Sequence, residues 1–396
     1  MINQYNNFLS QSSGSKTVGF ADKIRSMQAG GCKVIPLHTG DPDFDTPILI
    51  KESIQRAISN NFSHYSDSKG IPELREKIAE YVNKTKGIIV NPYEEIIVTN
   101  GGIHAFYSII ASLFNIGDEL IIPTPAWPTH INLPESSGIK VIQLSTSYEN
   151  NFLPSVEDFE KLRTSKTKAI LINFPNNPTG SIASIEFMDK IVNWAYENNI
   201  WIITDEVYDT ICDNSKEIYN GRLFDKGKNI ILSINSFSKS HAMTGYRLGY
   251  LIAPPNVIKQ VNKMTQFTVT NVSTTIQKGL ADVLMNEELF SEMTKMNLVY
   301  QNRKEFILEK MNESKLPLEF IRPFGAFYFF VGLNKLNLPF DNINEKLLEE
   351  ENTAMVDGKI YGESGSGFLR LTFAASIDNI DEGITRFLKF AERHYN

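Results

Sequence analysis

Short runs of isoleucine, leucine and valine recur along the chain, and amphipathic stretches separate them. Seven of the runs are predicted to be strands: Glu95–Thr99, Glu119–Ile122, Lys140–Leu144, Lys168–Asn173, Trp201–Thr204, Ile230–Ile234 and Leu248–Ala253. Several show no polar alternation, which is typical of strands covered on both faces. Helical patterns lie between them, for example over Gly102–Phe114 and Ile185–Glu197. The alternation predicts an α/β fold with a mostly parallel seven-stranded sheet.

The pattern changes along the 396 residues in a way that predicts three parts. Residues 46–290 carry the alternation and are expected to form a large domain. Residues 291–396 contain long charged helices and two strands, Ala326–Val331 and Phe368–Phe373, and are expected to form a smaller α+β domain. Residues 1–45 are expected to form an N-terminal arm, polar to about Phe20, and to complete the small domain.

Composition narrows the function classes. A net charge of −7 with both signs mixed along the chain gives no basic face for nucleic acid. Two cysteines, Cys32 and Cys212, cannot form a disulfide framework in a chain of this size, and we expect a reducing compartment. The histidines show no metal-ligand spacing, so no metal site is expected. Without an apolar signal core or a long apolar run, we expect a cytoplasmic protein that does not contact a membrane.

Polar and aromatic residues follow five of the predicted strands. They are Gly101-Gly102, Pro125–Trp127, Asn176–Gly180, Asp205–Tyr208 and Ser236–Lys239. In open parallel sheets, ligands bind in the crevice beyond the carboxyl ends of the strands. These segments are therefore predicted to line one site.

The stretch from Ser236 to Tyr250, SFSKSHAMTGYRLGY, is the most informative of these segments. It places Lys239 among small hydroxyl residues directly after a buried strand. A desolvated lysine amine loses its proton readily and can form a Schiff base with a carbonyl group. Ser236, Ser238 and Arg247 are donors suited to a phosphate nearby.

This stretch resembles the lysine motif of the class I/II aminotransferases, which are pyridoxal 5'-phosphate enzymes of fold type I. The family pattern is S-x-S-K followed by M-T-G-[WY]-R-[LI]-G-Y, and the sequence matches it throughout. The resemblance extends from the GDPDF run that begins at Gly40 to the FLRLTF run that contains Arg370. It implies an enzyme that passes the amino group of an amino acid to a 2-oxo acid.

Within this resemblance, Lys239 is the residue that forms the Schiff base and moves the substrate proton. Asp205 matches the aspartate that keeps the pyridine nitrogen protonated, which makes the ring an electron sink. Tyr208 and Asn177 match donors to the phenolic oxygen of the cofactor. These three roles are predictions that the resemblance supplies.

The resemblance also implies how the cofactor and substrate are held. The phosphate would lie against the turn of Gly101, Gly102 and Ile103, against Ser236, Ser238 and Arg247, and against Tyr65 from a second subunit. The last of these contacts implies a homodimer with shared active sites. Trp127 matches the aromatic residue stacked on the cofactor ring, although a core tryptophan is the simpler interpretation of that residue alone.

On the substrate side, Arg370 is predicted to hold the α-carboxylate through its guanidinium fork, assisted by Asn177 and by the backbone at Gly40. His38 lies two residues before Gly40, and its place could bring a second acid–base group to the substrate. A lone histidine on a strand more often has a structural role, and that interpretation is preferred for His38.

Two departures bear on the substrate. Aspartate-type members of the bacterial subgroup carry a lysine just after the two glycines, where this chain has Ile103, and others use an arginine in the stretch that corresponds to residues 264–277, which contains no Lys or Arg. A buried carboxylate without a cation is costly, so the donor is predicted not to be of the aspartate type.

Two alternatives use the same motifs. One is a lyase or cyclase of the same fold, which removes the same proton and then expels a leaving group or closes a ring. The other is a regulator with an aminotransferase-like domain and an added DNA-binding domain, which is not the expected interpretation because the sequence before Gly40 is short for such a domain.

Overall fold

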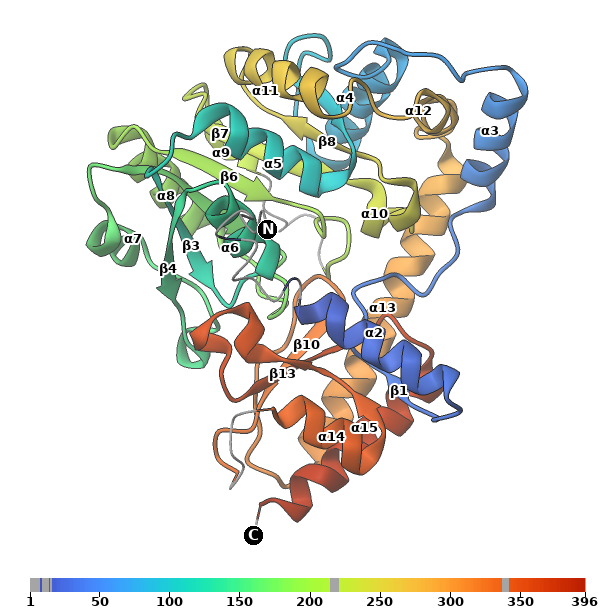
Figure 1. Ribbon diagram of the computed structural model, residues 1–396, viewed down its shortest axis with the longest axis vertical. Helices are drawn as coiled ribbons and strands as arrows, with labels where there is room; N and C mark the ends of the chain where they lie inside the picture. Colours follow the sequence, from blue (N-terminus) through green and yellow to red (C-terminus); the bar gives the residue numbers. More distant parts are fainter. Residues whose placement is uncertain (1–7, 9–13, 15, 214–220, 337–341, 396) are drawn as a thin grey trace, which may run out of the picture.

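In the computed structural model, seven strands form one sheet that alternates with helices along the chain (Figure 1). The model describes residues 8, 14, 16–213, 221–336 and 342–395. The strands are β2 (Ile96–Thr99), β3 (Glu119–Thr124), β4 (Lys140–Ser145), β5 (Thr167–Asn173), β6 (Trp201–Asp205), β7 (Ile231–Ser236) and β8 (Gly249–Ile252). All seven predicted strands are present, and their ends differ from the predicted ends by about two residues at most. The predicted fold class is confirmed.

The order across the sheet is β2-β8-β7-β6-β5-β3-β4. Only β8 runs antiparallel to its neighbours β2 and β7. The short connection from β7 to β8 explains this, because a parallel return needs a longer crossover. The carboxyl ends of β2, β3, β5, β6 and β7 therefore lie at one edge, and the five segments predicted to line a site follow them.

Helices cover both faces of the large sheet. One face, with Ile97, Leu232 and Leu251, packs against α5 (Gly101–Leu113) and α11 (Pro255–Thr268). The opposite face packs against α7 (Val156–Leu162) and α8 (Ile185–Glu197), and at its β2 end against α3 (Ile48–Ser59), α4 (Pro72–Lys86) and α12 (Thr274–Ala281). Burial on both faces accounts for the uninterrupted apolar runs of these strands.

A second sheet has four antiparallel strands in the order β12-β13-β10-β9. They are β9 (Glu319–Phe320), β10 (Tyr328–Gly332), β12 (Val356–Asp357) and β13 (Phe368–Thr372). The helices α14 (Ile343–Glu351) and α15 (Ile377–Arg393) lie beside it, and α13 (Glu287–Glu313) runs from the large-sheet region down to it (Figure 1). Three shorter helices, α6 (Pro128–Ser136), α9 (Gly221–Asp225) and α10 (Phe237–Ser240), lie in the large-sheet region.

The N-terminal part packs on the smaller sheet region. Strand β1 (Ile35–Pro36) pairs in parallel with β11 (Thr353–Ala354), and Thr372 N–H donates to Leu37 O over 2.9 Å. Helix α2 (Lys16–Ala29) begins inside the segment that was expected to be an arm, and buried Ile24 packs with Val34. The rest of the expected arm, residues 1–7, 9–13 and 15, lies outside the described residues. Among the described helices, none combines the length and the apolar character that a membrane crossing requires.

Candidate active site

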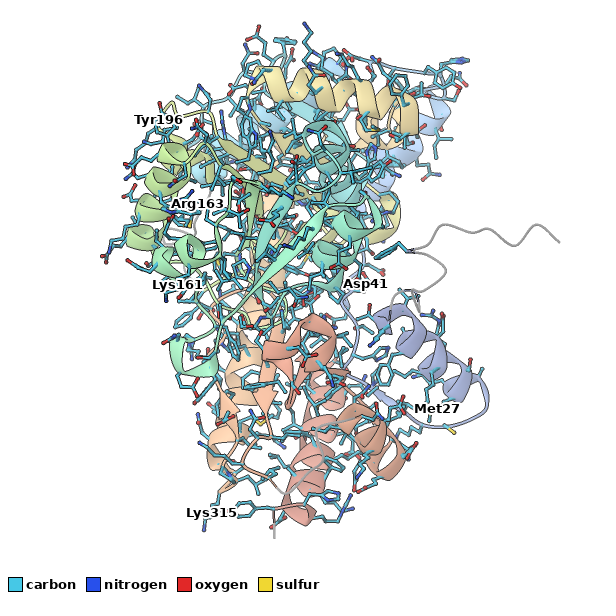
Figure 2. The ribbon with its side chains drawn as sticks, turned by 60° about the vertical axis from the view of Figure 1, so that its left-hand side comes forward. Met27, Asp41, Lys161, Arg163, Tyr196 and Lys315 are labelled. Carbon is cyan, nitrogen blue, oxygen red and sulfur yellow. The ribbon has the colours of Figure 1, made fainter. Side chains whose placement is uncertain are left out.

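A cavity of about 480 Å³ lies beyond the carboxyl ends of the large-sheet strands. The residues that line it come from α2 (Thr17, Val18, Ala21, Arg25), from the segment after β1 (His38, Thr39, Gly40, Asp41), from the large-sheet strand ends and their loops (Gly102, Ile103, Trp127, Asn173, Asn177, Asp205, Val207, Tyr208, Ser236, Ser238, Lys239, Thr244, Arg247), and from the small sheet (Tyr328, Arg370). In Figure 2, Asp41 lies where the upper part of the molecule meets α2 and the small sheet. The predicted site is therefore a single cavity between the two sheets.

Lys239 projects into this cavity from α10, which begins as soon as β7 ends. Ser236 starts the helix, because its Oγ accepts from Ser238 N–H over 3.1 Å. The half-buried Lys239 donates from Nζ to Gly40 O over 2.5 Å. Burial lowers the pKa of Lys239 to about 8, with help from the positive charges of Arg247 and Arg370 and against the influence of Asp41. The pKa of the amine therefore lies close to the pH range in which it can act as a nucleophile and a base.

This lowered pKa predicts a pH profile for the cofactor-free protein. The neutral amine is the reactive form, so about a quarter of Lys239 is reactive at pH 7.5, against about one in a thousand for an ordinary lysine. Acetylation of Lys239, followed by mass spectrometry, should rise with pH, reach half of its maximum near pH 8 and level off about one pH unit above that. Acetylation of a lysine in a model peptide, used as the reference, should still be rising steeply at pH 10, because its pKa is about 10.4. If the pH profile of Lys239 matched that of the peptide, it would contradict the conclusion that burial lowers the pKa of this amine.

Asp205 ends β6, and both of its carboxylate oxygens are held. Oδ1 accepts from Val207 N–H over 3.1 Å, and Oδ2 lies 2.8 Å from Nε2 of His130. His130 is fully buried on α6, and its ring meets Trp127 edge to face at a centroid distance of 5.2 Å. The carboxylate is therefore oriented toward the cavity and cannot rotate freely, as a group that must pair with a ring nitrogen requires.

Tyr208 follows Asp205 on the same loop and is buried. Its hydroxyl lies 2.8 Å from the hydroxyl of Tyr328, which is the first residue of β10. The two rings pack edge to face at a centroid distance of 5.6 Å. Burial raises the pKa of Tyr208 well above its usual value, so this hydroxyl stays protonated and able to donate.

A cluster of hydrogen-bond donors from the large-sheet strand ends also lines the cavity. It comprises the first turn of α5, the hydroxyls of Ser236 and Ser238, and the guanidinium of Arg247. Gly101 begins α5 at a φ of 75°, and a Cβ there would lie 2.4 Å from Arg247 Nη2. Arg247 itself has a left-handed φ of 53° and donates from Nη1 to Thr244 O over 2.8 Å. Free N–H groups of a helix start and a guanidinium are a site for a phosphate.

Arg370 lies on β13 and is buried. It donates from Nη2 to His38 O over 2.6 Å and from Nη1 to Asn177 Oδ1 over 3.2 Å. Its Cζ lies 4.2 Å above the centroid of the Tyr328 ring. These contacts fix the fork in the same cavity as Lys239, where it can pair with a carboxylate.

His38 lines the cavity and is 9% exposed. Burial, the Arg370 charge and the Arg25 charge lower the pKa of His38 to about 4. Its ring packs edge to face on Phe20 of α2 at 5.9 Å. His38 is therefore a neutral imidazole at physiological pH, and it can offer hydrogen bonds but no positive charge.

Most of the predicted site residues meet in this cavity. Gly101 lies behind it, against Arg247. Tyr65 is 86% exposed and is not among the described residues that line the cavity of its own chain. Sequence reasoning missed His130 and Tyr328, as well as the α2 residues at the rim. The position of His130, three residues after Trp127, was the only signal that could have indicated it.

This donor set fits pyridoxal 5'-phosphate. An anion site, a tryptophan, a fixed aspartate and a lysine with a lowered pKa line one cavity, and these are the groups that the phosphate, ring and aldehyde of that molecule would need. The glycine at position 101 keeps the anion site open, since a Cβ there would displace the Arg247 guanidinium.

Comparisons with known proteins agree with the geometry. Residues 32–387 match the family described as aminotransferase class I and II. The chain is 34% identical to the aspartate aminotransferase of Pyrococcus abyssi, covering 93% of this chain and 94% of the relative. It is 33% identical to aromatic-amino-acid aminotransferase 2 of Thermococcus litoralis, with the same coverage. The crystal structure of the Thermotoga maritima aspartate aminotransferase superposes with a TM-score of 0.90 at 34% identity, covering 98% of this chain and 100% of that one. This chain belongs to the class I and II aminotransferase family.

Proposed function

We propose that this aminotransferase takes the amino group from an amino acid without a second carboxylate and passes it to a 2-oxo acid, with Lys239 as the base. The family uses pyridoxal 5'-phosphate. The observation that carries the proposal is the Lys239 amine, which has a lowered pKa and lies in one cavity with the Arg370 fork and the Asp205 carboxylate.

Lys239 is proposed to remove the proton from the substrate Cα and later to return it. Its carbonyl contact at Gly40 holds the amine in place before the substrate arrives. When bound, the pyridoxal ring supplies an electron sink for the charge left on Cα. A base that is already within the cavity needs no further approach, which lowers the entropic cost of the step.

The residues around the ring are proposed to fix its protons. Asp205, held by His130, would keep a proton on the pyridine nitrogen. Tyr208 and Asn177 would donate to the phenolic oxygen, and Trp127 would stack on the ring. Gly102, Ile103, Ser236, Ser238 and Arg247 would hold the phosphate, with Gly101 shaping the turn.

The substrate is proposed to enter with its α-carboxylate toward Arg370 and its side chain toward α2 and His38. The Arg370 fork and Asn177 would fix the carboxylate, with the backbone at Gly40 nearby. With the carboxylate fixed, the Cα–H bond is aimed at Lys239. Val18, Ile103 and neutral His38 line the remaining wall, which suits an apolar or aromatic side chain.

The charges of the cavity support the choice of donor. Among the described lining residues, the cations are Arg25, Lys239, Arg247 and Arg370. The last three have proposed partners. Arg25 pairs with Asp22 on α2, and its side chain is 66% exposed, so it offers little to a buried carboxylate. A second carboxylate on the donor would therefore be desolvated without a full partner.

A single-turnover experiment tests this proposal. The holoprotein is mixed with phenylalanine, leucine, methionine, lysine and aspartate in turn, without any oxo acid. We expect one equivalent of 2-oxo acid, loss of the visible absorption and no ammonia with uncharged donors, and little change with aspartate. Sustained ammonia release would indicate a lyase or cyclase, and a fast response to aspartate alone would overturn the donor class.

Ile103→Lys is the matched variant for this experiment. It places a cation where the aspartate-type relatives of the resemblance carry one. A charge-assisted contact there should raise the aspartate rate roughly tenfold relative to the phenylalanine rate. An unchanged ratio would show that Ile103 does not face the donor side chain.

We also propose a homodimer in which Tyr65 completes the phosphate site of the other subunit. Tyr65 and Phe267 support this, because these large side chains are 86% and 83% exposed. The holoprotein should sediment at twice 44.8 kDa, and a monomeric active enzyme would contradict the shared site.

The division into residues 1–45, 46–290 and 291–396 remains our proposal for the domains. The boundary near residue 290 falls inside α13. Leu289 packs with the large-sheet core, whereas Tyr300, Ile307 and Met311 pack with the core of the small sheet. The helix would then link the two domains.

A further inference from the structure

Tyr328 makes contacts that neither the motifs nor the proposed roles explain. It lies on β10 of the small sheet, yet its hydroxyl is 2.8 Å from Tyr208 on the large-sheet side. It also lies 2.9 Å from the point where a Cβ of Gly40 would be. The hydroxyl thus lies between Gly40 and Tyr208, and Tyr328 lines the cavity.

The pair of hydroxyls has two possible arrangements. If Tyr208 donates to Tyr328, its only proton is used, and it can no longer donate to a ligand oxygen. If Tyr328 donates to Tyr208, the Tyr208 proton is free. In the second case the two hydrogen bonds run in one direction and polarise each other, which strengthens both.

The charges around the two rings favour the second arrangement. Burial raises the pKa of both phenols, and it raises that of Tyr208 well above its usual value. Arg370 lowers the pKa of both phenols, but its guanidinium lies 4.2 Å from the centroid of the Tyr328 ring, where its positive charge stabilises negative charge on Tyr328 directly. For Tyr208, the nearby Asp205 carboxylate adds to the rise. A cation over a phenol ring makes its hydroxyl the better donor, and in this pair the guanidinium of Arg370 lies over Tyr328.

We propose that Tyr328 is a positioning residue that donates to Tyr208, so that the Tyr208 proton is available to the phenolic oxygen of pyridoxal 5'-phosphate. This inference rests on the proposed function, since it requires Tyr208 at that oxygen. Arg370 takes part through its charge above the Tyr328 ring, which couples the carboxylate site to the phenolic end of the cofactor site.

The test is the pH at which the visible absorption of the holoprotein changes, which reports how well the phenolic oxygen is stabilised. Removal of the Tyr328 hydroxyl in Tyr328→Phe weakens the Tyr208 donation, so the midpoint should rise by about 0.2–0.6 pH unit. Tyr208→Phe should raise it further. In the double variant, Tyr328→Phe should add nothing, because its effect passes through Tyr208.

Each outcome decides the matter. A midpoint that falls in Tyr328→Phe would mean that Tyr208 donates to Tyr328 in the native protein, and it would overturn the proposal. An unchanged midpoint, or additive shifts in the double variant, would also overturn it. Tyr300→Phe is the matched control, since Tyr300 is buried in the same core and its hydroxyl has no hydrogen-bond partner among the described residues. Failure of the proposed function would look different, because the wild-type protein would then show no visible band.

Discussion

Replacement of Lys239 by alanine is expected to remove both the visible absorption of the holoprotein and its turnover. Among the described lysines, Lys239 alone has a lowered pKa, and its amine contacts Gly40 O in the cavity that Asp205 also lines. Loss of a general base alone costs about 10²–10⁴-fold, and loss of the covalent link adds to it. The measurements are an absorption spectrum and a steady-state rate with the preferred donor.

The fold should survive this change. Removal of a desolvated amine leaves no unpaired charge behind, so the thermal midpoint should not fall by more than a few degrees. Ser240→Ala, one residue further along α10, serves as the neighbouring control and should keep its colour. A Lys239→Ala protein that retained colour and turnover would remove the central assignment.

Replacement of Arg370 by alanine is expected to weaken amino-acid binding strongly. Truncation of one partner of a buried charged pair costs about 2–5 kcal/mol. This corresponds to a rise in the dissociation constant of roughly 30- to 5,000-fold. The constant can be measured by titration of the visible absorption with the preferred amino acid.

A substrate analogue separates carboxylate recognition from general damage. An amine that has the same side chain but no carboxylate should bind Arg370→Ala and the native protein about equally well. Arg370→Lys keeps the charge but loses the fork, so it should recover only part of the affinity. An unchanged dissociation constant for the amino acid in Arg370→Ala would place the carboxylate elsewhere.

Much of the fold could be predicted because the strands of the large sheet are covered on both faces. The run of residues 202–204, for example, is buried and mostly apolar, and Asp205, which follows it, lines the cavity. Asp205 and Lys239 could be located for the same reason. Each of these two residues comes after a predicted strand in the sequence, and this position predicts that it lies at the end of that strand.

His130 and Tyr328, which the sequence analysis missed, acquire their contacts in the site only through the folding of the chain. His130 looks like any single histidine on a helix, and only the folded chain brings its Nε2 to Asp205, 75 positions away. Tyr328 begins a run of buried aromatic residues and reads as core. Its hydroxyl gains meaning through Tyr208 and Arg370, which are distant in sequence. Such pairings depend on tertiary packing, which local patterns do not contain.

Helix α2 differs from the rest of the cavity wall in how it is anchored. Its buried contacts belong to a small separate cluster that includes Ile24, Val34 and Leu348, whereas Lys239, Asp205 and Arg370 lie on or directly after strands of the two sheets. Mutations on the cavity side of α2 are therefore expected to leave the packing of both sheets unchanged. Over evolutionary time, duplicated copies of such a gene can explore new donors through this helix while the chemical groups stay under selection, and paralogues should differ there first.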